Sequence, residues 1–310
     1  MKLWLHKSWR ITFSLYKILI PLIFIIEILK RIGAIEILGN LLSPLMNIVG
    51  LSGDMGIVLA SAMITNIYGG ITAYATIASH APLNAAEVGI LGTMMLMAHN
   101  LLVEIKIAHK SGLKILPILF FRIFSSFLFG MFASLIFKKL GLFQDSTVIT
   151  WKVSQALWVS SPLFNTVLHQ AWQLFLIFLI ITLLVGVLNI LELLGFTKYL
   201  TRFLHPVLKP LGIGSHAIPT VVIGLTLGLA YGGGLIIEQS HSGAITHREI
   251  LFSHLLLGIS HSYIEDSALV MMIGAPFLIV VPLRFIFAFL LVFLSEKIIG
   301  DKMRFFLHKQ

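Results

Sequence analysis

Cysteine is absent from this chain of 310 residues, and charged residues make up only 11% of it. The absence of cysteine excludes disulfide bonds and thiolate metal sites. A soluble domain of this length usually carries about 25% charged residues, which form its hydrated surface. That shell is missing here, while 58% of the residues are hydrophobic. The composition therefore predicts an integral membrane protein whose surface is largely covered by lipid.

Long apolar runs supply the candidate membrane spans. Ile18–Leu29, Leu174–Leu188 and Phe277–Leu294 belong to stretches that are long enough, as helices, to cross a hydrocarbon core of about 30 Å. Lysine and arginine together number 22 against 13 acidic residues. In a membrane protein this excess is typical of cytoplasmic loops and of contacts with anionic lipid. We therefore expect an all-α protein of the bacterial inner membrane, with the lipid bilayer as its partner and no nucleic acid.

The two halves of the chain match each other at a spacing of 162 residues. Turn residues and polar residues recur in the same order across most of both halves, which chance does not supply. The matches pair Pro44 with Pro206, Gly50 with Gly212, Glu87 with Glu249, His99 with His261, Glu104 with Asp266, Gly112 with Gly274, and Arg122 with Arg284. We assign residues 1–150 to a first copy. Residues 151–310 hold an interfacial connector, Thr150–Gln170, and the second copy.

Basic residues lie at opposite ends of the two copies. The turn Lys106–Lys114 carries three lysines, whereas its counterpart Ala268–Pro276 carries no basic residue. Conversely, Lys198–Lys209 is basic and its counterpart Glu36–Asn47 is not. Because positive charge marks cytoplasmic ends, the copies are expected to have inverted topology.

Inverted copies require an odd number of crossings each. The candidate helices of the first copy are Ile11–Leu29, Gly56–Ser79, Val88–Lys110 and Leu113–Phe137. We expect Gly56–Ser79 to be a re-entrant hairpin that breaks within Thr65–Gly70, because paired glycines weaken a helix. Its counterpart would break at Ala230–Gly234. The prediction is three transmembrane helices and one re-entrant helical hairpin per copy, with both termini cytoplasmic.

The small-residue breaks, an acidic residue before a helix, and the run Ser260-His261-Ser262-Tyr263-Ile264-Glu265-Asp266 together resemble the nucleoside-recognition, or Gate, domain. That family includes spore maturation proteins A and B, the membrane part of ferrous-iron transporter B and a segment of concentrative nucleoside transporters. The resemblance covers residues 18–137 and 172–298 and is strongest over Pro219–Arg284. It implies a transporter-like core with opposed hairpins, and it leaves the solute open.

Ionisable side chains inside the predicted spans need a partner or a role, because each costs about 2.5–3.5 kcal/mol at the bilayer centre. Glu104 and Arg122 lie at similar depths on either side of the turn at Gly112. Asp266 and Arg284 repeat this arrangement in the second copy. We expect each pair to form a salt bridge that holds two helices together. A gating or proton-coupling role is the alternative.

The two equivalent histidines, His99 and His261, are expected near the midplane, where inverted copies would face one shared centre. Glu265 follows His261 by four residues, a spacing that places both on one helix face, and its counterpart Val103 carries no charge. Imidazole and carboxylate suit a divalent transition metal, so we predict His99, His261 and Glu265 as metal ligands. The structural alternatives are buried histidines bonded to nearby carbonyls and a glutamate bonded to another helix.

Neutral polar side chains add to this predicted site, although such groups also bridge packed helices. The ones predicted to bind the solute or ion are Asn66, Tyr68, Asn100, Tyr231 and Ser262. Glu87 and Glu249 instead precede predicted helices, where a carboxylate complements the helix dipole.

These features favour a membrane transporter in which opposed hairpins gate a central site. Two solutes fit, a divalent metal cation or a nucleoside-like metabolite, and proton coupling is open. The alternative is a non-transporting scaffold that acts through protein partners. An intramembrane metal-dependent enzyme lacks a visible nucleophile and base, so we expect no enzyme activity and no cofactor. The sequence leaves a homo-oligomer open.

Overall fold

The structure, a computed structural model, describes residues 44–78, 80–147, 194–229, 236–237, 239–299 and 305–307, and positions 172, 175, 179 and 190. The predicted first span Ile11–Leu29, the connector Thr150–Gln170 and the site residue Tyr231 lie outside the described residues.

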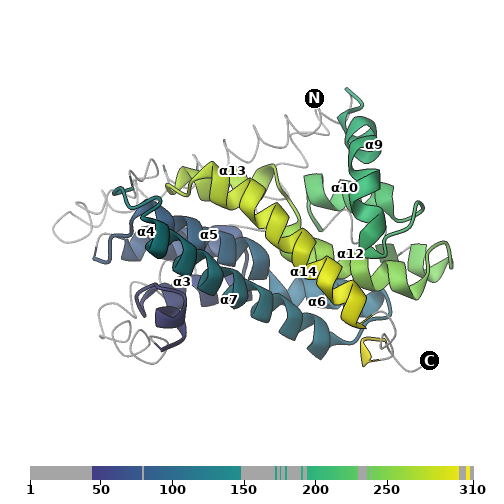
Figure 1. Ribbon diagram of the computed structural model, residues 1–310, viewed down its shortest axis with the longest axis horizontal. Coiled ribbons are helices and arrows are strands. Elements are labelled where there is room, and N and C mark those ends of the chain that lie inside the picture. Colours follow the sequence, from purple (N-terminus) through teal and green to yellow (C-terminus); the bar gives the residue numbers. More distant parts are fainter. Residues whose placement is uncertain are drawn as a thin grey trace.

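The described residues form helices and no β-strand (Figure 1). The prediction of an all-α chain is therefore confirmed for them. In chain order they are α3 (Met55–Ile64), α4 (Ile67–Ile77), α5 (Ala85–Ala98), α6 (Leu101–Lys110), α7 (Ile115–Leu140), α9 (Phe196–Leu208), α10 (Ile218–Leu227), α12 (His247–Ser260), α13 (Glu265–Met272) and α14 (Arg284–Ile299). A 3-10 turn, Lys209–Leu211, follows α9, and a π turn, Ile279–Leu283, leads into α14.

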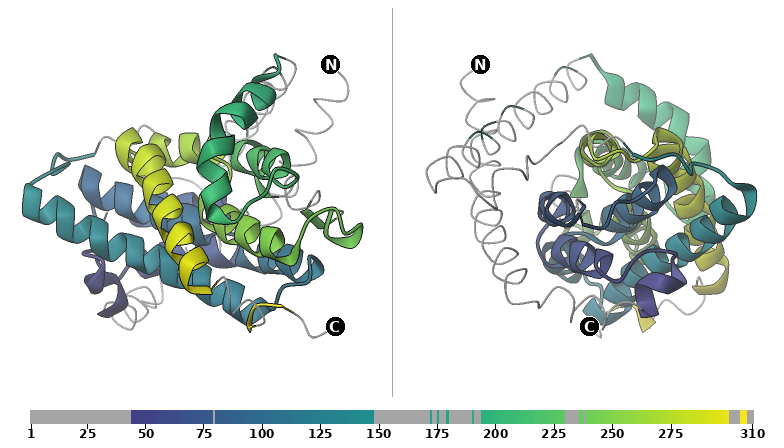
Figure 2. Two further views of the ribbon diagram at one scale, coloured as in Figure 1. Left: turned by 45° about the vertical axis from the view of Figure 1, so that its right-hand side comes forward. Right: turned by 90° about the vertical axis from the view of Figure 1, so that its left-hand side faces the viewer.

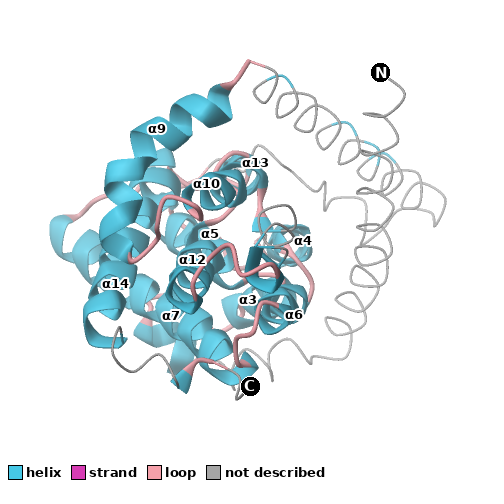
Figure 3. Cartoon of the chain, turned by 90° about the vertical axis from the view of Figure 1, so that its right-hand side faces the viewer, coloured by secondary structure: helices cyan, strands magenta, loops and turns pink. Residues whose placement is uncertain are grey.

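Three helical segments of the described part are long and apolar enough to cross a membrane: Ala85–Lys110, Ile115–Leu140 and Ile279–Ile299. The last two expose large apolar side chains, among them Leu116, Phe120, Leu135, Ile286, Leu290 and Ile298. Apolar surface of this extent is typical of a face that meets lipid. By contrast, α5 and α12 are buried along most of their length and lie in the middle of the bundle (Figure 3).

A helical hairpin forms where a re-entrant hairpin was predicted. α3 ends at Ile64, and Asn66 is extended and accepts a hydrogen bond from the Gly69 N–H, which caps α4. The chain therefore reverses at residues 65–66, and the paired glycines lie inside α4. Gly70 serves packing, because a Cβ there would lie 2.7 Å from Cβ of Ala62 on α3.

The prediction that Val88–Lys110 is one continuous helix is wrong. α5 ends at Ala98, His99 is extended with ψ 165°, and Asn100 is left-handed with φ 52° before α6 begins. Asparagine enters the left-handed region more readily than most residues, whereas the apolar sequence on either side gives no sign of a break. The second copy breaks in the same way between α12 and α13, at His261 and Ser262.

Residues 162 apart share local conformation at several points. Gly50 and Gly212 have φ of 76° and 75°, Asn100 and Ser262 both have 52°, and Gly112 and Gly274 have 92° and 100°. Asn84 with Glu87 and Thr246 with Glu249 form matching capping boxes at the starts of α5 and α12. The Asn100 N–H donates to the Ala62 carbonyl at 3.0 Å, and the Ser262 N–H donates to the Gly224 carbonyl at 3.3 Å. At these positions the sequence match is also a match of backbone conformation.

The equivalent helices α7 and α14 run antiparallel (Figures 1 and 2). Before α7, the Lys114 N–H donates to the carbonyl of Phe306, which follows α14, at 2.8 Å. Further along, the rings of Phe129 and Phe287 pack edge to face with centroids 5.3 Å apart. The start of α7 therefore lies near the chain that leaves α14, and the two helices pass each other in opposite directions.

Candidate functional site

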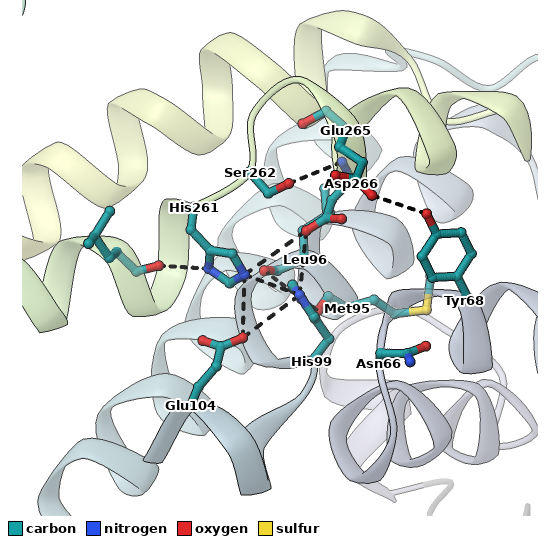
Figure 4. Close-up of polar contacts among 12 residues, drawn as sticks. Asn66, Tyr68, Met95, Leu96, His99, Glu104, His261, Ser262, Glu265 and Asp266 are labelled. Carbon is teal, nitrogen blue, oxygen red and sulfur yellow. Dashed lines mark hydrogen bonds and ion pairs between the residues drawn. The ribbon is translucent and has the colours of Figure 1, made fainter. Parts of the chain in front are cut away.

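The two interrupted helices bring His99 and His261 together (Figure 4), and both residues are buried. Each histidine directly follows the last residue of its helix, α5 or α12. Their Nε2 atoms lie 3.1 Å apart and their ring centroids 4.8 Å apart. Only 5% of the surface of His99 and 3% of that of His261 is exposed. Equivalent residues of the two halves thus meet through the same atom.

Two buried arginines hold the broken helix ends. The Nη2 groups of Arg122 and Arg284 donate to the carbonyls of His99 and His261, respectively. The Arg122 Nε also donates to the Gly258 carbonyl at 2.7 Å. Helix breaks leave carbonyls without a partner, and a buried unpaired carbonyl is costly. The arginines therefore stabilise the breaks, a role that sequence reasoning missed because it predicted no break there.

Two carboxylates approach the histidine pair. Glu104 places Oε1 3.3 Å from Nε2 of His261 and 3.8 Å from Nε2 of His99. Asp266 places Oδ2 3.5 Å from Nε2 of His99 and 4.0 Å from Nε2 of His261. Each histidine therefore lies nearer the acid of the other half, which is the reciprocal pairing expected across a two-fold axis.

The predicted salt bridges form in one half and not in the other. Arg122 Nη1 lies 2.8 Å from Glu104 Oε2, as expected. The predicted pairing of Asp266 with Arg284 is wrong. Arg284 instead donates to the Ser267 hydroxyl at 3.4 Å and lies over the ring of Tyr263, 4.4 Å from its centroid. The Asp266 carboxylate turns to the histidines instead.

Glu265 does not join this group. The chain between His261 and Glu265 is not helical, since Ser262 has a φ of 52° and α13 begins only at Glu265. The four-residue spacing therefore does not place the two side chains on one helix face, and the predicted pairing of Glu265 with His261 is wrong. Glu265 Oε1 instead accepts a hydrogen bond from the Tyr68 hydroxyl at 3.2 Å, which links α13 to the hairpin (Figure 4).

The remaining predicted site residues have structural roles at the breaks. Asn66 caps α4. Asn100 and Ser262 adopt the left-handed backbone conformation at the two helix breaks. The Ser262 hydroxyl also accepts from the Asp266 N–H at 3.4 Å. These contacts position the backbone around the histidine pair.

We call His99, His261, Glu104 and Asp266 the central cluster.

The central cluster replaces the predicted set of His99, His261 and Glu265. The sequence analysis did not predict Asp266 and Glu104 as ligands, because it assigned them to salt bridges with Arg284 and Arg122, respectively. One signal could have found them. Both acids follow their histidine by five residues in the matched halves, so symmetry places them together wherever the histidines meet.

Comparison with known proteins finds similarity to a membrane protein and does not assign the chain to a family. No family model and no solved structure matches the chain. The chain is similar to a protein of Bacillus subtilis (strain 168) described as "Uncharacterized membrane protein YvoD". The two are 27% identical over 275 residues, which cover 88% of this chain and 86% of that protein. Together with the three apolar helical segments, this similarity supports a membrane protein with transmembrane helices.

Proposed function

We propose that the chain is a transporter of the bacterial inner membrane, with cytoplasmic termini, that carries a small polar solute through the central cluster. The observation that carries the proposal is the meeting of two interrupted helices at buried polar groups from both halves. Irregular backbone at membrane depth is tolerated where it lines a polar cavity or is enclosed by protein. Broken helices that meet near the midplane are the usual construction of transporter sites.

The relation between the halves supports inverted copies. Contact between equivalent residues through the same atom, His99 Nε2 to His261 Nε2, is what an approximate two-fold axis between the halves would produce. The antiparallel course of α7 and α14 agrees with an axis that lies in the membrane plane, as in inverted-repeat transporters.

The burial of the central cluster supports a role beyond packing. Glu104, Asp266, Arg122 and Arg284 are each at most 8% exposed. The arginines stabilise the helix breaks. Replacing buried ion pairs by apolar residues is often neutral or stabilising, so stability alone does not call for the two carboxylates that face the histidines. Intramembrane charges commonly mark the pathway of an ion or substrate.

The hairpin α3–α4 is suited to gate the site. It contacts the central region through the Tyr68 hydroxyl on Glu265 and through the Ala62 carbonyl on the Asn100 N–H. In the other half, α10 makes the equivalent backbone contact through the Gly224 carbonyl and Ser262. Alternate release of these contacts would open the centre to one face at a time. The resemblance to the Gate domain agrees with such opposed hairpins.

Uptake by vesicles containing the purified protein tests the proposal. A panel of divalent metal cations, nucleosides and organic anions is offered to wild type, His261→Ala and His254→Ala. His254 is a matched control, because it is a buried histidine of α12 outside the central cluster. We expect uptake of one solute class, lost in His261→Ala and retained in His254→Ala.

Absence of uptake of every solute by wild-type vesicles would contradict transport and favour a scaffold. Equal loss in both variants, with both proteins monodisperse, would also contradict a central site at His261.

A further inference from the structure

In both histidines of the central cluster Nδ1 faces a backbone carbonyl, and this creates an electrostatic conflict between the Nε2 atoms. Nδ1 of His99 lies 3.2 Å from the carbonyl oxygens of Met95 and Leu96, and Nδ1 of His261 lies 2.8 Å from that of Leu257. A carbonyl oxygen only accepts hydrogen bonds, so each Nδ1 carries the hydrogen. In the neutral rings both Nε2 atoms then present lone pairs.

Those lone pairs face each other at an Nε2–Nε2 distance of 3.1 Å. Two acceptors at this distance repel unless a cation lies between or beside them. Metal-binding histidines characteristically donate their other ring N–H to a backbone carbonyl, which fixes the tautomer and directs the free nitrogen to the ion. Both histidines are arranged in this way.

The spacing of the donor atoms fits one small divalent ion. Nε2 of His99, Nε2 of His261 and Oδ2 of Asp266 lie within 4.8 Å of one another, with separations of 3.1, 3.5 and 4.0 Å. Ligands at 2.0–2.1 Å from a tetrahedral ion are about 3.3 Å apart, so the separations bracket that value. Glu104 Oε1, 3.3 Å from His261 Nε2, offers a fourth donor.

The carboxylates of the central cluster are arranged to face a cation. Glu104 and Asp266 each direct an oxygen toward the histidine nitrogens. The guanidinium groups of Arg122 and Arg284 instead donate to the backbone carbonyls of the histidines. Arg122 binds the Glu104 oxygen that points away from the histidines, so it orients that carboxylate from behind.

We infer that the central cluster binds a divalent first-row transition-metal ion through His99, His261, Asp266 and Glu104. Two imidazoles and two carboxylates suit zinc, cobalt or ferrous iron better than calcium or magnesium, which prefer all-oxygen sites. The inference rests on the proposed function, since it names the transported solute. It also corrects the ligand set predicted from the sequence, with Asp266 in place of Glu265.

Equilibrium dialysis of the purified full chain against Co²⁺ tests the inference, with metal content and the visible spectrum of bound cobalt as readouts. We expect one ion per chain, displaced by Zn²⁺ and not by Mg²⁺, with a spectrum typical of four-coordinate nitrogen and oxygen ligands. His99→Ala, His261→Ala and Asp266→Asn should each weaken binding at least tenfold. His254→Ala should bind as wild type does. His261→Gln serves as a second variant if an alanine variant does not purify as a monodisperse protein.

Failure of this inference is distinguishable from failure of the proposed function. The metal site is overturned if wild type binds no cobalt, or if the three variants still bind it. Wild type would bind no cobalt if the two rings instead share a proton. His261-dependent uptake of an organic solute without metal binding would leave transport standing. Metal binding without uptake in vesicles would keep the site and overturn transport.

Discussion

The two helix breaks share a left-handed residue, Asn100 or Ser262, and differ in side-chain pairing and in where the next helix begins. At the first break Glu104 reaches both Arg122 and the histidines. At the second, Asp266 reaches the histidines and Ser262, and Arg284 turns to Ser267 and Tyr263. The aspartate side chain is one methylene shorter than the glutamate side chain, and α13 begins two residues later than the position equivalent to the start of α6. We predict that side-chain length decides whether the carboxylate is held by an arginine or left available to the central cluster.

Of the substitutions considered, removal of each arginine should show the largest difference in stability between the two breaks. Arg122→Met strands the buried Glu104 carboxylate, and breaking a buried pair typically costs about 3–5 kcal/mol. Arg284→Met leaves mainly carbonyl groups without a donor, which costs about 1–3 kcal/mol. We expect a larger loss of thermal stability for Arg122→Met, measured on detergent-solubilised protein.

Adding Glu104→Gln to Arg122→Met should recover part of that loss, because it removes the stranded charge. Equal destabilisation by the two arginine variants, or no recovery in the double variant, would contradict the difference between the breaks.

Asp266→Glu should make the second break resemble the first. The longer side chain can reach Arg284, which would compete with the central cluster for the carboxylate. We expect cobalt affinity to fall about tenfold, a magnitude typical of altered support for a metal ligand, with little change in thermal stability. Unchanged affinity would mean that side-chain length is not what separates Asp266 from Arg284.

Tyr68→Phe should have the smallest effect, because it removes a single hydrogen bond between the two halves. It removes the hydroxyl that donates to Glu265 and keeps the ring. A hydrogen bond to a charged group contributes about 1.5–3 kcal/mol, and this one is only partly buried, so we expect the lower end of that range. Cobalt affinity should stay within about twofold of wild type, whereas a tenfold loss would place Glu265 among the ligands after all.

Much of this arrangement could be predicted from the sequence. The matched polar residues predicted that His99 and His261 would share a centre, and the turn at Gly112 placed Glu104 beside Arg122. Both inferences depend only on spacing along the chain, which the sequence gives directly.

The helix breaks could not be predicted in the same way. His99 and Asn100 interrupt an apolar segment that contains neither proline nor paired glycines nearby, and the break is stabilised by the distant Arg122. The preference of Asp266 for the histidines over Arg284 likewise depends on side-chain reach across the fold. The error over Glu265 followed from the missed break, since a continuous helix would have brought it beside His261.

The central claim, that the copies face opposite sides of the membrane, is tested most directly by labelling. The native chain lacks cysteine, so single substitutions of exposed residues next to the two equivalent turns, Lys110→Cys and Phe277→Cys, each give one reactive thiol. A membrane-impermeant maleimide is applied to intact cells and to inverted vesicles. We predict that Phe277→Cys is labelled in intact cells and Lys110→Cys only in inverted vesicles. Labelling of both from the same face would contradict inverted copies.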